Sequence, residues 1–217
     1  MTDIVDIIVN KLLILPGILI GLSVHEFAHA FVAYKLGDRS QRFQGRLTLD
    51  PTKHIDPLGF LFLLLVGFGW AKPVMVNSRE FKNPRVDDTL VSLAGPLMNL
   101  ITAVIFTVVL GVALIYMSNG NQITDIIITI ITGIIQINLV LMVFNLIPIP
   151  PLDGHHILGN IGGAPVWNFY YKNAEILRFA LMALIIFGGT KFIISPIVNK
   201  TYSFLISTMI KVVSGML

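Results

Sequence analysis

The 217-residue sequence contains no cysteine and few charged residues. The absence of cysteine excludes a disulfide framework and a thiolate metal site, so a zinc site here would need histidine and carboxylate ligands. Charged residues make up 12% of the chain, whereas a soluble globular domain has about 25%. Because a water-exposed surface needs charge, this deficit and the hydrophobic content of 55% indicate a membrane protein.

The N-terminus also lacks the basic region and the small-residue cleavage site of a secretory signal peptide. It carries Asp3 and Asp6 instead, so we expect the first apolar segment to remain in the protein. The net charge is +3. Basic cytoplasmic loops of a membrane protein explain this excess better than nucleic-acid binding does, so no nucleic-acid partner is expected.

Four apolar segments are long enough for a membrane-spanning helix, which needs about 20 residues. They comprise residues 12–34, 89–117, 123–147 and 177–198. The polar turn at 118–121 predicts an antiparallel hairpin between the second and third of them. A further segment, 203–217, is short and could span the membrane or lie at its interface.

The segment 57–70 is apolar but also short, and Lys72-Pro73 follows it. We predict a re-entrant half-helix there, followed by extended chain from Trp70 to Asn77. Irregular backbone at membrane depth is tolerated only beside protein or a water-filled cavity, so this segment is a candidate cavity wall.

These patterns predict an all-α polytopic membrane fold of about five to six transmembrane helices, with a small re-entrant or extended element at 57–77. We expect a single domain over residues 1–217. Its zinc-site core would cover about 12–158 and its C-terminal helices about 174–217.

Charge placement predicts the orientation. Eight of the 15 Lys and Arg residues lie between residues 36 and 88, whereas the turn at 118–121 has none. The positive-inside rule therefore places 36–88 in the cytoplasm and 118–121 outside the cell membrane. The inner half of the first span, which contains His25 and His29, then lies toward the cytoplasm.

His25, Glu26 and His29 form an HExxH motif within the first apolar segment. Positions i and i+4 share one face of a helix, so both imidazoles can bind one zinc ion. Glu26 can take a proton from water that zinc has made acidic. Ionisable groups within a membrane are costly and usually functional. The alternative is a hydrogen-bonded polar cluster that joins helices.

Catalytic zinc usually has three protein ligands, so two histidines leave one position open. Asp153 is the best candidate, because it follows an apolar span and the prolines at 148, 150 and 151 stop that helix from continuing. An ordinary Asp-Gly turn in a loop explains the same residues equally well.

The motifs together resemble the site-2 protease family of intramembrane zinc metalloproteases. HEFAH at 25–29, LAGPLMN at 93–99 and FNLIPIPPLDG at 144–154 are similar to its three signature segments. GWAKPV at 69–74 resembles the extended segment of its compact prokaryotic branch, which has no PDZ or CBS modules. The resemblance covers about Gly21 to Leu158.

This resemblance implies zinc-dependent hydrolysis of peptide bonds in or near the transmembrane segment of a substrate protein, within the lipid bilayer. It implies one Zn²⁺ per chain, held by His25, His29 and Asp153, with Glu26 as the catalytic base. It also implies that Asn145 lies near the scissile carbonyl, where its amide can stabilise an oxyanion.

A substrate helix must unwind before cleavage, and the extended segment could pair with the freed strand. The expected substrate-binding residues are therefore Trp70, Ala71, Lys72, Pro73 and Val74. Asn99 could also face the site, although helix packing explains it as well.

Two observations leave other interpretations open. His155 and His156 follow Gly154, where the family often has small residues and Arg, and they could bind metal or lie at the cytoplasmic rim. Intramembrane His and carboxylate groups would also suit a proton or metal-ion transporter. A non-catalytic binder of membrane proteins is the third alternative.

Overall fold

The computed structural model describes residues 4–66, 69–117 and 121–215, and these residues form helices without a β-strand. The all-α prediction is therefore confirmed. The helices are α1 (Ile4–Lys35), α2 (Ser40–Phe43), α3 (Pro51–His54), α4 (Pro57–Val66), α5 (Pro84–Tyr116), α6 (Gln122–Asn145), α7 (Asp153–Gly162), α8 (Ala164–Ile186) and α9 (Thr190–Ser214), with a 3₁₀ turn at Ser78–Glu80.

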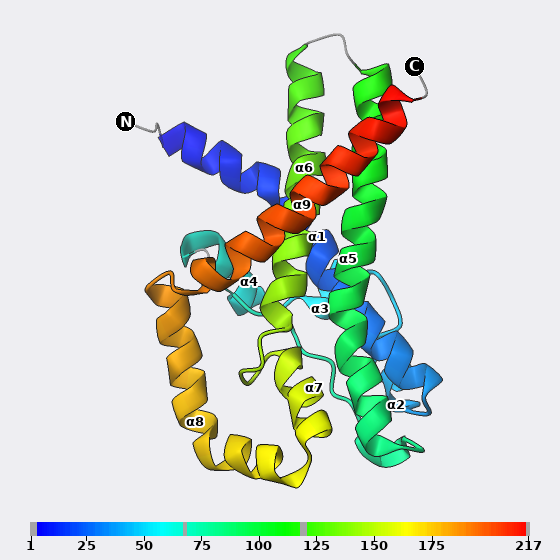
Figure 1. The fold of residues 1–217 in the computed structure, drawn as a ribbon, viewed down its shortest axis with the longest axis vertical. Coiled ribbons are helices and arrows are strands. Elements are labelled where there is room, and N and C mark those ends of the chain that lie inside the picture. Colours follow the sequence, from blue (N-terminus) through cyan, green and yellow to red (C-terminus); the bar gives the residue numbers. More distant parts are fainter. Residues whose placement is uncertain (1–3, 67–68, 118–120, 216–217) are drawn as a thin grey trace.

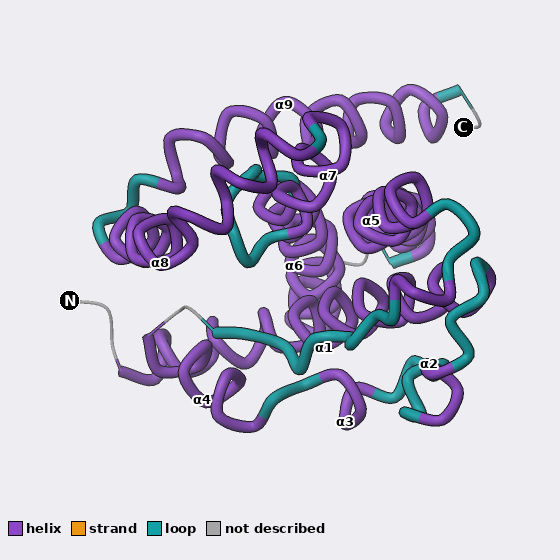
Figure 2. The backbone as a smooth tube through the Cα atoms, turned by 90° about the horizontal axis from the view of Figure 1, so that it is seen from below, coloured by secondary structure: helices purple, strands orange, loops and turns teal. Residues whose placement is uncertain are grey.

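Helices α1, α5 and α6 pack against one another and form the centre of the molecule (Figure 1). Seen from below, α5 and α6 lie between α1 on one side and α7 to α9 on the other (Figure 2). The short helices α2, α3 and α4 lie beyond α1. The N-terminus of α7 therefore faces the central helices, which carry the HEFAH and LAGPLMN segments.

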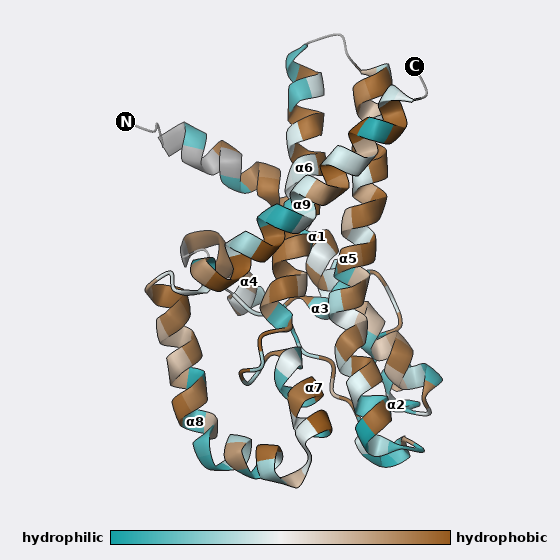
Figure 3. Ribbon diagram, in the orientation of Figure 1, coloured by the Kyte–Doolittle hydropathy of each residue, from teal (hydrophilic) through white to brown (hydrophobic). Residues whose placement is uncertain are grey.

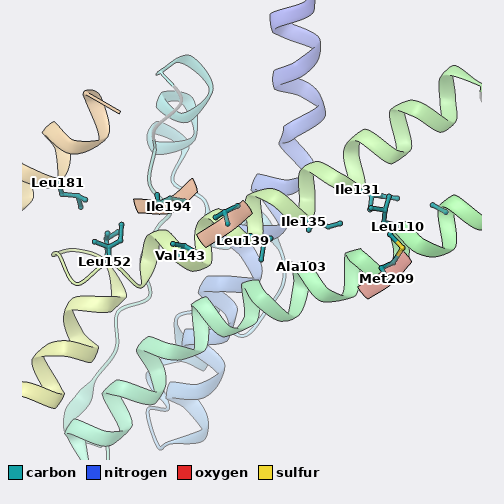
Figure 4. Close-up of a cluster of buried hydrophobic side chains, with 13 residues drawn as sticks. Ala103, Leu110, Ile131, Ile135, Leu139, Val143, Leu152, Leu181, Ile194 and Met209 are labelled. Atoms are coloured by element: carbon teal, nitrogen blue, oxygen red, sulfur yellow. The ribbon is translucent and has the colours of Figure 1, made fainter. Parts of the chain in front are cut away.

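Small residues allow the close approach of α1 to α6. A Cβ atom at Gly17 would lie 3.1 Å from the carbonyl oxygen of Gly133. Such small-residue contacts are typical of helix packing in membranes. The largest apolar cluster lies along α6, where Ile135 and Leu139 are completely buried against α5 and α9 (Figure 4).

Three helical segments are long and apolar enough to cross a membrane: Lys11–Lys35, Pro84–Tyr116 and Gln122–Asn145. A fourth crossing is counted if the bent pair α8 and α9 forms one span. The predicted number of five to six is thus not confirmed. Figure 3 shows predominantly hydrophobic residues along α5 and α6, and hydrophilic residues near α2 and the start of α5.

The prediction of one continuous span over 177–198 is wrong. Helix α8 ends at Ile186 and α9 begins at Thr190, with an angle of 68° between them. Gly188 has a φ of +72°, a conformation that glycine adopts without steric cost. The glycine pair at 188–189 therefore breaks a segment whose hydrophobicity alone suggested one helix.

Helix α4 contains 10 residues. Its length is about 15 Å at about 1.5 Å per residue, half of the hydrocarbon thickness of about 30 Å. The length of α4 agrees with the half-helix predicted within 57–70. The chain from Ala71 to Asn77 is irregular apart from an isolated antiparallel bridge between Ala71 and Ile55. Of the predicted turn at 118–121, residues 118–120 lie outside the described residues.

Candidate metal centre

Helix α1 presents His25, Glu26 and His29 to the interior of the molecule. Their exposed fractions are 5%, 8% and 7%. The two histidines are one turn apart on the same face, as the i and i+4 spacing requires. Their ring centroids lie 4.5 Å apart with the planes nearly perpendicular, so both rings reach the same small volume.

Asp153 is the first residue of α7 and comes from the opposite side of this volume. Its Oδ2 atom lies 3.2 Å from Nε2 of His25 and 3.4 Å from Nε2 of His29. Burial raises the pKa of the Asp153 carboxyl, but the adjacent His29 and His25 lower it further, so the net pKa is below its ordinary value. The carboxylate is therefore ionised at neutral pH.

The orientation of the His25 ring follows from a chain of buried amides. Nδ1 of His25 lies 2.7 Å from Oδ1 of Asn99. The Asn99 amide nitrogen donates to the carbonyl of Gly21 and to Oδ1 of Asn138, so its oxygen must face His25. The Asn138 nitrogen in turn donates to the carbonyl of Ile134. His25 therefore carries its ring hydrogen on Nδ1.

His29 has the same tautomer for a simpler reason. Its Nδ1 lies 2.7 Å from the carbonyl oxygen of Val91, which can only accept a hydrogen bond. In the neutral imidazole, Nε2 is then an unprotonated acceptor. Histidines that bind metals commonly donate their second nitrogen to a carbonyl or similar group in this way.

When both imidazoles are neutral, three lone-pair donors converge without a hydrogen atom among them. The two Nε2 atoms lie 3.0 Å apart, and the three ligand atoms of His25, His29 and Asp153 all lie within 4.8 Å of one another. Oδ2 of Asp153 is buried without a hydrogen-bond partner in the described part of the chain. Such a group suits a cation, and two imidazoles with one carboxylate are ligands that Zn²⁺ prefers.

Gly95 on α5 leaves the space that the two imidazoles occupy. A Cβ atom at this position would lie 2.5 Å from Nε2 of His29 and 2.6 Å from Cε1 of His25. Any larger residue would therefore displace both rings. This contact gives a physical reason for the glycine in the LAGPLMN segment.

Glu26 lies between two cavities that meet at the centre. One, of about 440 Å³, is also lined by His29, Asp153 and Val74. The other, of about 480 Å³, has mainly apolar walls that include Trp70 and Phe144. One carboxylate oxygen of Glu26 accepts a hydrogen bond of 3.1 Å from the backbone N–H of Val74. The base candidate is thus beside the three ligand atoms and next to the extended segment.

The other predicted residues are placed as follows. Asn145 lines both cavities, and its amide donates to the carbonyl of Leu141 on its own helix. Trp70, Ala71, Pro73 and Val74 line one or both cavities.

Two residues that the sequence grouped with substrate binding lie elsewhere. Asn99 is completely buried behind His25 and lines neither cavity. Lys72 also lies outside both cavity walls.

His155 and His156 do not join the three ligand atoms. Nδ1 of His155 bonds to the carbonyl of Leu152, and Nδ1 of His156 lies 3.0 Å from a carboxylate oxygen of Asp88. The same oxygen accepts a bond of 2.7 Å from Asn160, so Asp88 joins α5 to α7. Sequence reasoning missed Asp88 and Asn138, because no local pattern indicates contacts between helices so far apart in the chain.

Comparisons with known proteins place the chain among peptidases. The model of peptidase family M50 matches residues 13–115 and 111–188. "Putative zinc metalloprotease YwhC" of Bacillus subtilis is 45% identical over 151 residues, which cover 66% of each protein. "Putative zinc metalloprotease Rip2" of Mycolicibacterium smegmatis is 34% identical over 152 residues, which cover 68% of this chain and 56% of that protein. The comparison with solved structures gave no match.

The matched regions thus span just under two thirds of YwhC and little more than half of Rip2.

Proposed function

Because this chain belongs to peptidase family M50, we propose that it is an intramembrane zinc metalloprotease that cuts peptide bonds in or near transmembrane segments of substrate proteins. One observation carries the proposal: the Glu26 carboxylate lies beside a buried group of three lone-pair donors that could hold a metal ion. When bound, zinc supplies a Lewis acid that acidifies water and polarises a carbonyl group.

The side chains around the centre have three separate roles: metal binding, proton transfer and stabilisation of the oxyanion. His25, His29 and Asp153 would hold the ion. Glu26 accepts the proton of the attacking water and can return it to the leaving amine. Asn145, at the meeting point of the two cavities, would turn its amide from Leu141 to the developing oxyanion.

The extended segment would bind the substrate backbone. Trp70, Ala71 and Pro73 line one cavity beside Glu26, and Pro73 and Val74 line the other. A transmembrane helix must release its internal hydrogen bonds before its carbonyls can be attacked, and pairing with an extended neighbour replaces them. The apolar cavity beside Trp70 and Phe144 suits the hydrophobic side chains of such a substrate.

The chain is a multi-pass membrane protein. We further propose that it lies in the cytoplasmic membrane with the metal centre toward the cytoplasm. The density of Lys and Arg between residues 36 and 88 supports this orientation. The centre lies in the half of α1 that leads into this basic region.

The test compares wild type with Glu26→Gln on a purified transmembrane substrate. We expect wild type to release two fragments whose masses identify the cut bond. Glu26→Gln should retain zinc but cleave about 10²- to 10⁴-fold more slowly, because a positioned base contributes about that factor. Zinc content is measured by elemental analysis.

Glu175→Gln is the matched control, because it makes the same change on an exposed residue of α8. It should cleave at the wild-type rate. Full activity of Glu26→Gln would refute the mechanism, and transport of ions or protons without cleavage would favour the transporter alternative.

A further inference from the structure

The extended segment after Trp70 is held in place by side chains from the loop that follows α1. The carbonyl of Met75 accepts a bond of 2.8 Å from Gln41, and the N–H of Asn77 donates to the carboxylate of Asp38. The carbonyls of Lys72 and Pro73 accept bonds from Arg46. This loop therefore sets the position of the segment relative to α1.

Arg46 is unusual among these side chains, because it is a buried cation paired with carbonyl groups. Its exposed fraction is 5%. Nη1 donates to the carbonyls of Lys53 (2.7 Å) and Lys72 (3.0 Å), and Nη2 donates to that of Pro73 (3.0 Å). Within the described residues, its guanidinium forms no ion pair with a carboxylate. Burying a charge is costly unless it is well bonded, and these carbonyls offset the cost.

The Pro73–Val74 peptide group connects this cation to the catalytic base. Its carbonyl oxygen accepts the bond from Arg46, and its N–H donates to Oε2 of Glu26 at 3.1 Å. One planar peptide unit thus lies between a guanidinium and a carboxylate. Hydrogen bonds arranged in series polarise one another, so Arg46 strengthens the bond that Val74 donates.

This N–H is also the only hydrogen-bond donor to the Glu26 carboxylate among the residues that the structure describes. It fixes one carboxylate oxygen and leaves the other for the attacking water. The ligands His25, His29 and Asp153 make no bond to Arg46 or to Val74. Orientation of the base and binding of the metal therefore depend on different contacts.

We propose that Arg46 is a positioning residue for Glu26 and acts through the Pro73–Val74 peptide. This inference rests on the proposed function. A simple loop anchor would affect folding or substrate affinity, whereas a residue that orients the base affects the chemical step. The two roles therefore predict different changes in kcat and KM.

Two variants break the connection at different points. Arg46→Lys keeps the charge but loses the planar fork that bonds three carbonyls. Val74→Pro keeps the Pro73 carbonyl and removes the N–H that reaches Glu26. Arg42→Lys is the control, because it makes the same change on a nearby exposed arginine, in α2.

The measurements are zinc content, kcat and KM of the purified full chain with a transmembrane substrate. Each variant should lose about 10-fold or more in kcat, the size of an effect near 1.4 kcal/mol, with zinc content unchanged. KM should also be unchanged in Arg46→Lys, because Arg46 lines neither cavity. The double variant should be no slower than the slower single variant, because both changes remove one connection. Arg42→Lys should match wild type.

An unchanged kcat in Val74→Pro, a loss confined to KM or zinc content in Arg46→Lys, or additive losses in the double variant would each overturn the inference. If Arg46→Lys does not fold, Val74→Pro alone decides. Wild type and Glu26→Gln are measured beside them. Absent cleavage by wild type contradicts the proposed function, whereas active wild type with an unaffected Val74→Pro contradicts only the role of Arg46.

Discussion

At the scale of single residues, the metal centre depends on groups behind its ligands as much as on the ligands. Asn99 and Asn138 are both completely buried, and together they decide which nitrogen of His25 carries hydrogen. The amide nitrogen of Asn99 donates to the backbone carbonyl of Gly21, and that of Asn138 donates to the carbonyl of Ile134. A carbonyl oxygen can only accept a hydrogen bond. The direction of the whole chain of bonds is therefore set by the backbone.

We predict that Asn138→Ala weakens zinc binding. The change leaves one Asn99 N–H without its acceptor, which allows that amide to rotate and His25 to lose its preferred tautomer. Partners behind metal ligands typically contribute about 10- to 100-fold in affinity. Competition with a zinc chelator measures the change. Asn199→Ala, an exposed position on α9, serves as the control, and equal affinity in the two variants would contradict the prediction.

At the scale of elements, the polar loop after α1 positions an extended segment that has no sheet to support it. Asp38 is completely buried and accepts bonds from Gln41, from the N–H of Asn77 and from the N–H of Ser40. Burial raises the pKa of Asp38, but these donors lower it further, so the net pKa is below its ordinary value. The ionised carboxylate therefore stabilises the fold.

The stability that Asp38 provides should depend on pH. Because its pKa is lower in the folded state, the contribution is present above the unfolded pKa of about 3.9 and is lost as pH falls through the folded value. We predict that Asp38→Asn lowers the free energy of unfolding by about 1–3 kcal/mol at neutral pH. Thermal unfolding in detergent at several pH values checks this, and a deficit that persists unchanged in acid would contradict it.

At the scale of the whole molecule, the central helices α1, α5 and α6 surround the metal centre, and α7 closes it by bringing in Asp153. Asp88 joins α5 to α7 through His156 and Asn160, which keeps this closing helix in place. The exposed faces of the long helices are apolar, as lipid contact requires. The proposed orientation of the bundle in the membrane rests on the distribution of charge.

Single cysteines can test this orientation, because the chain has none of its own. We predict that Gln122→Cys, at the start of α6, reacts with a membrane-impermeant maleimide on intact cells. Arg42→Cys, in the basic loop, should react only after the membrane is opened, because positive loops stay in the cytoplasm. Both positions are exposed. The reverse pattern of labelling would place the metal centre toward the outside.

The sequence alone determined whatever depends on neighbours in the chain. The low charge predicted a membrane protein, and the spacing of His25 and His29 predicted two ligands on one helical face, because helical geometry is local. The ends of α1, α5 and α6 were predicted within two residues, but α1 begins earlier than predicted, at Ile4, and so does α5, at Pro84. Hydrophobicity could not reveal the break at 187–189, since it depends on backbone conformation at Gly188.

Only the tertiary structure shows that Asp153 lies beside His25 and His29, a placement that spacing left open. Its carboxylate reaches histidines that lie more than 120 positions earlier in the chain, since 153 − 29 = 124. The partners of Asn99 and Arg46 are likewise distant in the chain and come from tertiary contacts. Such contacts depend on how distant parts of the chain pack together. The cost of burying a lone pair or a cation can be judged only when its surroundings are known.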